Sequence, residues 1–229
     1  MRVVVNEGLV KRRAETAQRA MTIGMMMLLI ALVLSFNLRY IWLAYLLMLA
    51  GVVLLNWGVS SGNKWLRKPR IDQELAKALK GLDHGHRLYN YLLPAEHVLL
   101  SPAGLFVLKV KQQDGKISCR GEKWRRQFSL RRLLRALIEP PLGNPSKQAR
   151  LETDKLRRFM TKHLPGVDVP MQPVVVFINP KADLDVVEPV LPAIALNALK
   201  AYLRSATQER MAPQETLQAL ANLFDEQAT

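Results

Sequence analysis

The N-terminal quarter of the chain contains two long apolar runs, at residues 20–36 and 40–57. Runs of 17 and 18 residues lie within the range of about 17–25 residues that can span a bilayer as a helix. The aromatic residues Tyr40, Trp42 and Trp57 stand near the run ends, where amphipathic rings favour the membrane interface. The pattern therefore predicts a two-span transmembrane hairpin, with a buried hairpin in a soluble core as the alternative.

Positive charge flanks this hairpin on both outer sides, whereas the turn between the runs carries Arg39 alone. The flanking cations are Arg2, Lys11, Arg12, Arg13 and Arg19 before the hairpin, and Lys64, Arg67, Lys68 and Arg70 after it. Because Lys and Arg gather on the cytoplasmic side of membrane proteins, we expect a multi-pass protein of the cell membrane. Both termini and the globular domain are then cytoplasmic.

The same pattern divides the chain into four parts. These are a basic N-terminal segment at residues 1–19, the hairpin at 20–58, a basic linker at 59–70 and a globular domain at 71–229. The linker is expected because Ser60, Ser61, Gly62 and Asn63 form a helix-breaking cluster.

Within the globular part, residues 96–111 predict two strands joined by a tight turn at Pro102, Ala103 and Gly104. The second strand is a nearly unbroken run of β-forming residues, which is typical of a strand covered on both faces. Strand side chains alternate, so Lys109 and Lys111 share one face, opposite the neighbouring apolar residues. This placement suggests a polar cleft at the end of a central strand.

The remaining segments predict an α/β domain. A helical pattern covers residues 71–93 with interruptions, strands are expected at 115–120 and 171–178, and helices at 146–163, 191–203 and 213–224.

The formal charge of +14 indicates an anionic partner, either DNA or RNA or an anionic lipid. The densest basic cluster consists of Arg120, Lys123, Arg125, Arg126, Arg131, Arg132 and Arg135. It forms either a solvated helix face, a phosphate-binding face or a face for the lipid leaflet. Trp124 and Phe128 beside it can stack on bases or pack within the domain. Cys119 is the sole cysteine, which is compatible with a reducing compartment.

Several of these residues carry a family resemblance. They are His97, Pro102, Gly104 and Lys111, then Gly115 to Ile117, Trp124, Asn144 and Pro145 with Gln148, and the strand that ends at Pro180. Together the stretch at 75–203 resembles the NERD domain, the nuclease-related domain, which is similar to the restriction-endonuclease-like fold. The resemblance implies a mixed central sheet flanked by helices, here preceded by the transmembrane hairpin.

The resemblance also implies three positions for metal-binding acids, and here these positions hold His86, Glu96 and Lys109. Only Glu96 can bind Mg²⁺, and a lysine repels the cation by about 4 kcal/mol per unit of charge at 4 Å and an effective dielectric near 20. We therefore expect no metal, no cofactor and no metal-dependent cleavage. His84, His86 and His97 lack the spacing of a zinc site.

Three hypotheses remain. The first is a membrane-anchored, catalytically degenerate NERD-like domain, a pseudoenzyme that binds nucleic acid or another polyanion. Its phosphate-binding residues are Lys109, Lys111, Arg125, Arg126 and Gln148, the last matching a family glutamine that faces the scissile phosphate in related nucleases. Alternatively, Glu96 pairs with Lys109 as an internal salt bridge.

The second hypothesis is an active nuclease whose metal site uses a shifted acid, such as Asp83 or Asp114. The third is a non-catalytic structural or interaction module that binds anionic lipid or protein. Its oligomeric state does not follow from the sequence.

Overall fold

A computed structural model describes residues 1–83, 85–127, 141–167, 169–209 and 211–227. His84, Phe128, Arg131, Arg132 and Arg135 from the sequence analysis therefore lie outside the described residues. The described chain forms two compact units. One contains residues 7–70, and the other contains residues 1–6, 71–127 and 142–227.

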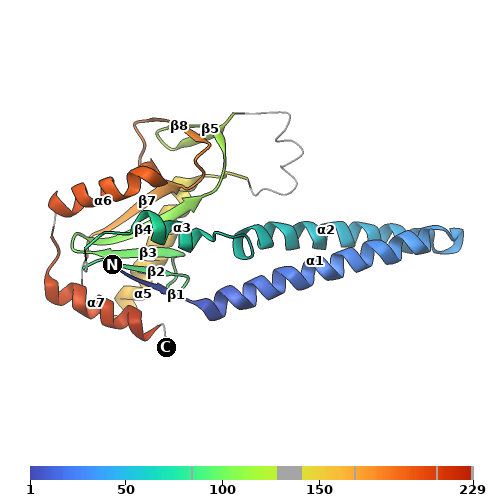
Figure 1. Cartoon of the computed structure of the whole chain (residues 1–229), viewed down its shortest axis with the longest axis horizontal. Coiled ribbons are helices and arrows are strands. Elements are labelled where there is room, and N and C mark those ends of the chain that lie inside the picture. Colours follow the sequence, from blue (N-terminus) through green and yellow to red (C-terminus); the bar gives the residue numbers. More distant parts are fainter. Residues whose placement is uncertain (84, 128–140, 168, 210, 228–229) are drawn as a thin grey trace. The chain divides into compact units, whose positions relative to one another are not determined.

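The first unit is a helical hairpin of α1 (Glu7–Ser35) and α2 (Ile41–Trp65), joined by the 3₁₀ turn η1 (Leu38–Tyr40) (Figure 1). Small residues let the two helices approach closely. A Cβ atom added at Gly24 would lie 2.8 Å from the backbone nitrogen of Leu55, and one at Gly58 would lie 2.8 Å from that of Met21. Such small-residue contacts are typical of helix packing in membranes.

The outer faces of this hairpin expose large apolar side chains, including Ile23, Leu29, Leu46 and Val53. Both helices are long and apolar enough to cross a membrane, and only 22% and 11% of their most apolar stretches are buried. This exposure argues against the buried hairpin of a soluble core, and it makes the hairpin compatible with membrane association.

The units differ from the predicted division of the chain in two places. Residues 2–5 form strand β1 (Arg2–Val5) of the globular unit, so the basic segment 1–19 is not continuous. The predicted linker is helical as far as Trp65, because Gly62 in its centre packs against Met21 rather than breaking the helix.

The globular unit is built on a mixed six-stranded sheet, which confirms the predicted fold class. Its order is β1, β2 (Arg87–Asn90), β3 (His97–Ser101), β4 (Gly104–Lys111), β7 (Met171–Phe177) and β9 (Ala193–Ala195). Strands β2, β3 and β4 pair antiparallel, whereas β1, β7 and β9 join as parallel neighbours. The second sheet has the order β6 (Lys123–Arg126), β5 (Gly115–Arg120) and β8 (Ala182–Val187).

Helices cover both faces of the large sheet (Figure 1). Helices α3 (Ile71–Ala78) and α6 (Leu196–Glu209) pack with Phe106 and Leu108 of β4. Helices α5 (Pro145–His163) and α7 (Gln214–Glu226) pack with Leu105 and Val107 on the other face. Alternate residues of β4 thus enter different cores, as its unbroken apolar run predicts.

Two segments differ from the predicted helices. The helix expected over 71–93 stops at Ala78, and Gly81 follows with φ +83°, a conformation that favours glycine. Leu88 then pairs with Leu99 between β2 and β3, because pairing with the sheet outweighs its helical spacing. The helix expected over 191–203 begins at Leu196, since Ala193 to Ala195 form β9 beside β7.

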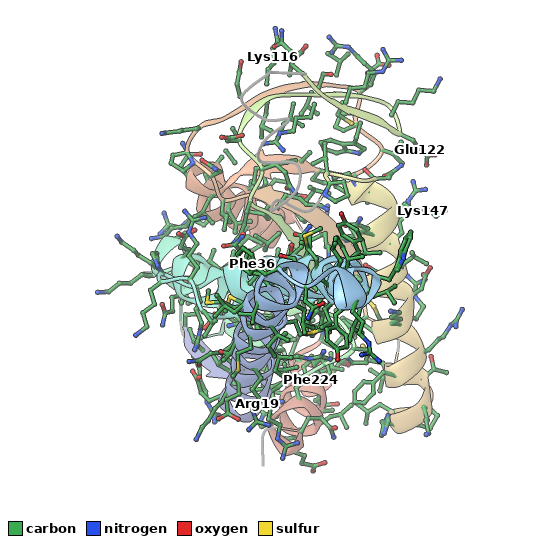
Figure 2. The ribbon with its side chains drawn as sticks, turned by 90° about the vertical axis from the view of Figure 1, so that its right-hand side faces the viewer. Arg19, Phe36, Lys116, Glu122, Lys147 and Phe224 are labelled. Atoms are coloured by element: carbon green, nitrogen blue, oxygen red, sulfur yellow. The ribbon has the colours of Figure 1, made fainter. Side chains whose placement is uncertain are left out.

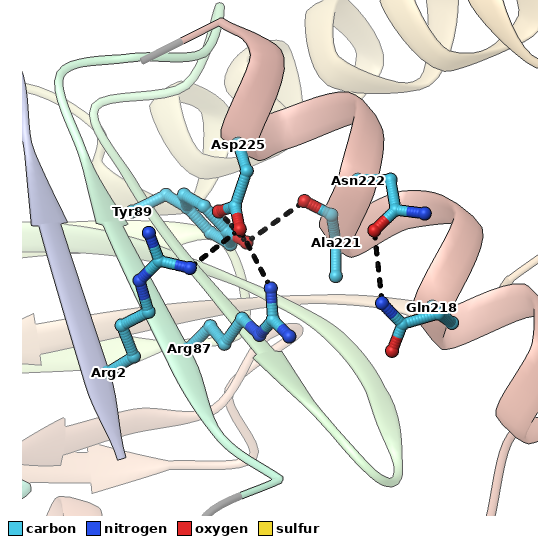
Figure 3. A network of polar contacts seen from close by, with 7 residues as sticks. All are labelled: Arg2, Arg87, Tyr89, Gln218, Ala221, Asn222 and Asp225. Atoms are coloured by element: carbon cyan, nitrogen blue, oxygen red, sulfur yellow. Dashed lines mark hydrogen bonds and ion pairs between the residues drawn. The ribbon is translucent and has the colours of Figure 1, made fainter. Parts of the chain in front are cut away.

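A polar cluster fastens the last helix to the first two strands (Figure 3). The carboxylate of Asp225 on α7 accepts hydrogen bonds from Arg2 of β1 at 2.8 Å and Arg87 of β2 at 2.9 Å. The hydroxyl of Tyr89 donates to the same carboxylate at 2.9 Å. Burial, followed by the interaction with Asp225, raises the pKa of Tyr89 to about 12.

The raised pKa predicts how stability changes at high pH. Tyr89 holds its proton to about pH 12 when folded and to about pH 10 when unfolded. Its contribution is complete below pH 10 and is lost as the pH rises to 12, a change of about 2–3 kcal/mol in the free energy of unfolding. We expect Tyr89→Phe to flatten this fall in denaturant titrations between pH 9 and 12. Equal slopes for both proteins would contradict the assignment.

Candidate functional site

The candidate site lies where the end of β4 meets the first turns of α5. Lys109 and Lys111 point to the same side of β4, about 7 Å apart along the strand. Gln148 and Glu152 stand one helical turn apart on α5, at about 6 Å. These spacings match, so each lysine meets one helix residue. Lys109 contacts Glu152 at 2.5 Å, and Lys111 donates to the side-chain oxygen of Gln148 at 2.7 Å.

The start of α5 is fixed by its own capping residues. The side chain of Asn144 accepts a hydrogen bond from the backbone nitrogen of Lys147 at 2.9 Å, and Pro145 occupies the first helical turn. Trp124 of β6 donates to the hydroxyl of Ser146 at 2.9 Å, and its ring packs 5.7 Å from that of Phe177. Trp124 therefore has the packing role that the sequence left open.

The ammonium group of Lys109 lies between two carboxylates. Besides the contact with Glu152, it lies 3.6 Å from a carboxylate oxygen of Glu96. Lys109 and Glu152 are each 13% exposed, whereas Glu96 is 35% exposed. Burial alone would lower the pKa of Lys109, but the two carboxylates outweigh it and hold this pKa above its usual value. Lys109 is therefore a permanent cation at neutral pH.

Lys111 is engaged just as closely. Its ammonium donates to the backbone oxygen of Leu142 at 2.9 Å as well as to Gln148, and the residue is 8% exposed. Gly143 keeps this contact open, because a Cβ atom there would lie 2.9 Å from the side-chain nitrogen of Gln148. Lys111 thus ties β4 to the segment that leads into α5.

The charges of the site cancel, since Glu96 and Glu152 balance Lys109 and Lys111. A divalent cation entering between the carboxylates would have to displace the ammonium of Lys109. In the described part of the chain, no group of three or more His, Cys, Asp or Glu side chains is placed to hold a metal. The residues present do not fit the metal that a nuclease of this fold requires.

The structure brings together Glu96, Lys109, Lys111 and Gln148, which the sequence singled out. The internal salt bridge between Glu96 and Lys109, left open above, is present. Arg125 and Arg126 instead lie on β6 of the small sheet. Arg125 is exposed.

The two acids considered as shifted metal ligands, Asp83 and Asp114, make contacts elsewhere in the domain. Asp114 forms an ion pair with Arg126 at 2.5 Å. The backbone oxygen of Asp83 accepts a hydrogen bond from the nitrogen of His86 at 3.1 Å.

The two described histidines at the family's positions are buried within the domain. His86 is 3% exposed, and burial lowers its pKa, so the ring is neutral at pH 7. His97 contacts the side-chain oxygen of Asn90 through Nδ1 at 2.8 Å, and its ring lies 4.9 Å from that of Tyr91. Both histidines therefore belong to the structural core of the domain.

Glu152 is the site residue that the sequence analysis missed. The sequence could have indicated it, because Glu152 follows Gln148 by four positions on a predicted helix and therefore lies on the same face.

We predict that Glu152→Gln lowers the free energy of unfolding by about 1–3 kcal/mol, because the charged partner nearest Lys109 is lost. The matched control is Asp154→Asn, which removes the same charge from the exposed side of the same helix. We expect the control to stay within about 0.5 kcal/mol of the wild type. Equal losses in denaturant titrations would show that Glu152 is no more important than a surface acid.

The segment that carries this site matches a known family. Residues 69–178 match the family model described as the nuclease-related domain, NERD. The match extends from just before α3 to the end of β7, and it includes all five residues of the site. It confirms the resemblance seen in the sequence. No curated protein and no solved structure matches the chain.

Proposed function

Because residues 69–178 match the NERD family model, we propose that this chain is a membrane-anchored and catalytically degenerate nuclease-related protein. Its function is to bind nucleic acid at the cytoplasmic face of the membrane without cutting it. The family match supports the nuclease-related part of this proposal. The geometry of the site and the charge of the surface support the rest.

The position of Lys109 carries the proposal. Its ammonium contacts Glu152 and faces Glu96, so the pair of carboxylates already has a cation. A unit positive charge 4 Å from a divalent ion costs about 8 kcal/mol at an effective dielectric near 20. With Lys111 adjacent, the site has no net negative charge to offset this repulsion. Metal-dependent hydrolysis is therefore disfavoured at this position.

The connectivity of the chain supports the anchor. Strand β1 precedes the hairpin and pairs with β2, which follows it. The segments on both sides of the hairpin must therefore lie on the same side of any membrane that it enters, which requires two spans. At the base of the hairpin, Arg70 forms an ion pair with Glu7 at 2.9 Å. The flanking cations favour the cytoplasmic side.

The net positive charge of the chain supports an anionic partner, but the lysines of the candidate site do not contact that partner. Lys109, Lys111, Gln148 and Arg126 are all engaged within the domain. Of the residues expected to bind phosphate, Arg125 is exposed and is retained as a contact. The phosphate groups of nucleic acid would thus meet the surface of the domain rather than its degenerate site.

We expect the full chain in phosphatidylcholine discs to release no products from DNA or RNA, single-stranded or duplex, with Mg²⁺ or Mn²⁺. It should bind these nucleic acids at low salt and lose them as salt rises, because phosphate contacts release counterions. Fluorescence anisotropy and gel assays measure both. Cleavage that Lys111→Ala abolishes would overturn the proposal, and absence of binding at 20 mM salt would remove its nucleic-acid part.

A second test replaces the cation of the site. Lys109→Glu places a third carboxylate beside Glu96 and Glu152, so the protein should be destabilised without metal and should gain stability when Mn²⁺ is added. The neutral control, Lys109→Gln, should respond much less, and the wild type should not respond. Thermal unfolding with and without millimolar Mn²⁺ provides the readout. A specific Mn²⁺ response of the wild type would mean that metal displaces Lys109.

Glu152 gives the active-nuclease hypothesis one specific observation, because it is an additional acid on the helix beside the site. For that function a divalent metal would have to displace Lys109 from both carboxylates. The cleavage assay above decides between the two functions.

A further inference from the structure

The solvent side of α5 carries a row of cations that the site does not use. Lys147, Lys155, Arg158 and Lys162 follow one another at intervals of one or two helical turns, with the exposed Leu151 between the first two. At 3.6 residues per turn these positions fall on one side of the helix. We call these four cations the basic stripe. Figure 2 shows Lys147 on the outer side of α5.

The acids of α5 do not neutralise the basic stripe. Glu152 is turned inward to Lys109, and Asp154 is paired with Arg157 at 3.6 Å. Arg150 in turn pairs with Glu122 at 2.7 Å. Among the described residues, none of the four stripe cations has an acidic partner. The inward turn of Glu152 therefore makes the outer side of this helix strongly positive.

The dimensions of the stripe suit a phosphate backbone. From residue 147 to residue 162 the helix rises about 22 Å, which is about two thirds of a duplex turn of about 34 Å, so its cations can reach several phosphates. The stripe contains no aromatic residue for base stacking. Contacts of this kind fix a duplex in place without reading its sequence.

A lipid surface fits the stripe less well. A helix that lies on a bilayer inserts a broad apolar face between the headgroups. The apolar face of α5, with Leu156 and Met160, is buried in the domain core, and Leu151 is the one apolar residue within the stripe. The charge of the helix is therefore presented without an apolar face to insert.

We propose that the basic stripe of α5 is the docking surface for the phosphate backbone of a nucleic-acid duplex. This inference rests on the proposed function and assigns it to a particular surface.

The test compares two charge-matched variants of the full chain in phosphatidylcholine discs. Lys155→Gln/Lys162→Gln removes two charges from the stripe. Lys77→Gln/Lys80→Gln removes two exposed charges from the α3 region, on the opposite side of the large sheet. Binding of a 20-base-pair DNA or RNA duplex is measured from 20 to 200 mM salt. Thermal unfolding checks that both variants are folded.

We expect the stripe variant to lower the slope of log affinity against log salt by about 2, since each lost phosphate contact removes about 0.9. The α3 variant should keep the slope of the wild type. If the wild type binds and both variants bind equally, the inference is overturned while the proposed function stands. If the wild type binds single strands but no duplex at 20 mM salt, the inference alone is overturned, and if it binds neither, both are overturned.

A third measurement tests whether the basic stripe contacts anionic lipid instead of a duplex. The reactivity of Lys155 and Lys162 towards an acetylating reagent is compared in discs with and without phosphatidylglycerol, and then with added duplex. Protection by duplex in phosphatidylcholine discs supports the inference. Protection by phosphatidylglycerol alone, without protection by duplex, assigns the stripe to the membrane and overturns it.

Discussion

The ammonium of Lys109 and its two carboxylates organise the centre of this domain. Lys109 comes from the central strand β4, Glu96 from the residue just before the neighbouring strand β3, and Glu152 from the helix that covers them. A buried cation requires such partners, because its desolvation is costly when it is unpaired. The same requirement turns Glu152 inward, sets the register of α5 against β4 and leaves the outside of that helix positive.

This internal charge pair determines which groups of the site are free to bind a ligand. A metal site needs carboxylates whose negative charge is not already balanced, whereas here the lysine satisfies them within the protein. Next to it, Lys111 contacts Gln148 of the covering helix and the backbone of Leu142. The charged groups at the end of β4 are thus part of the packed interior of this domain.

Much of this arrangement could be predicted from the sequence, because it depends on local patterns. The alternation along β4 places Lys109 and Lys111 on one face, and the helical spacing of α5 identifies its buried side. Glu152, the second partner of Lys109, was harder to predict than Glu96. Its contact depends on how a helix and a strand align across more than 40 residues of chain. Short strands such as β9 were missed for a related reason, because their pairing partners, not their own residues, define them.

Strand β1 was missed for the same reason, and its position has a consequence for synthesis. It is made before the helical hairpin, and its partner β2 is made only after it. Asp225, which binds Arg2 and Arg87 together, follows every strand of the sheet in the chain. During synthesis β1 must therefore wait for the whole hairpin before it can pair with β2, and the cluster on Asp225 can form only after all strands of the sheet have been made.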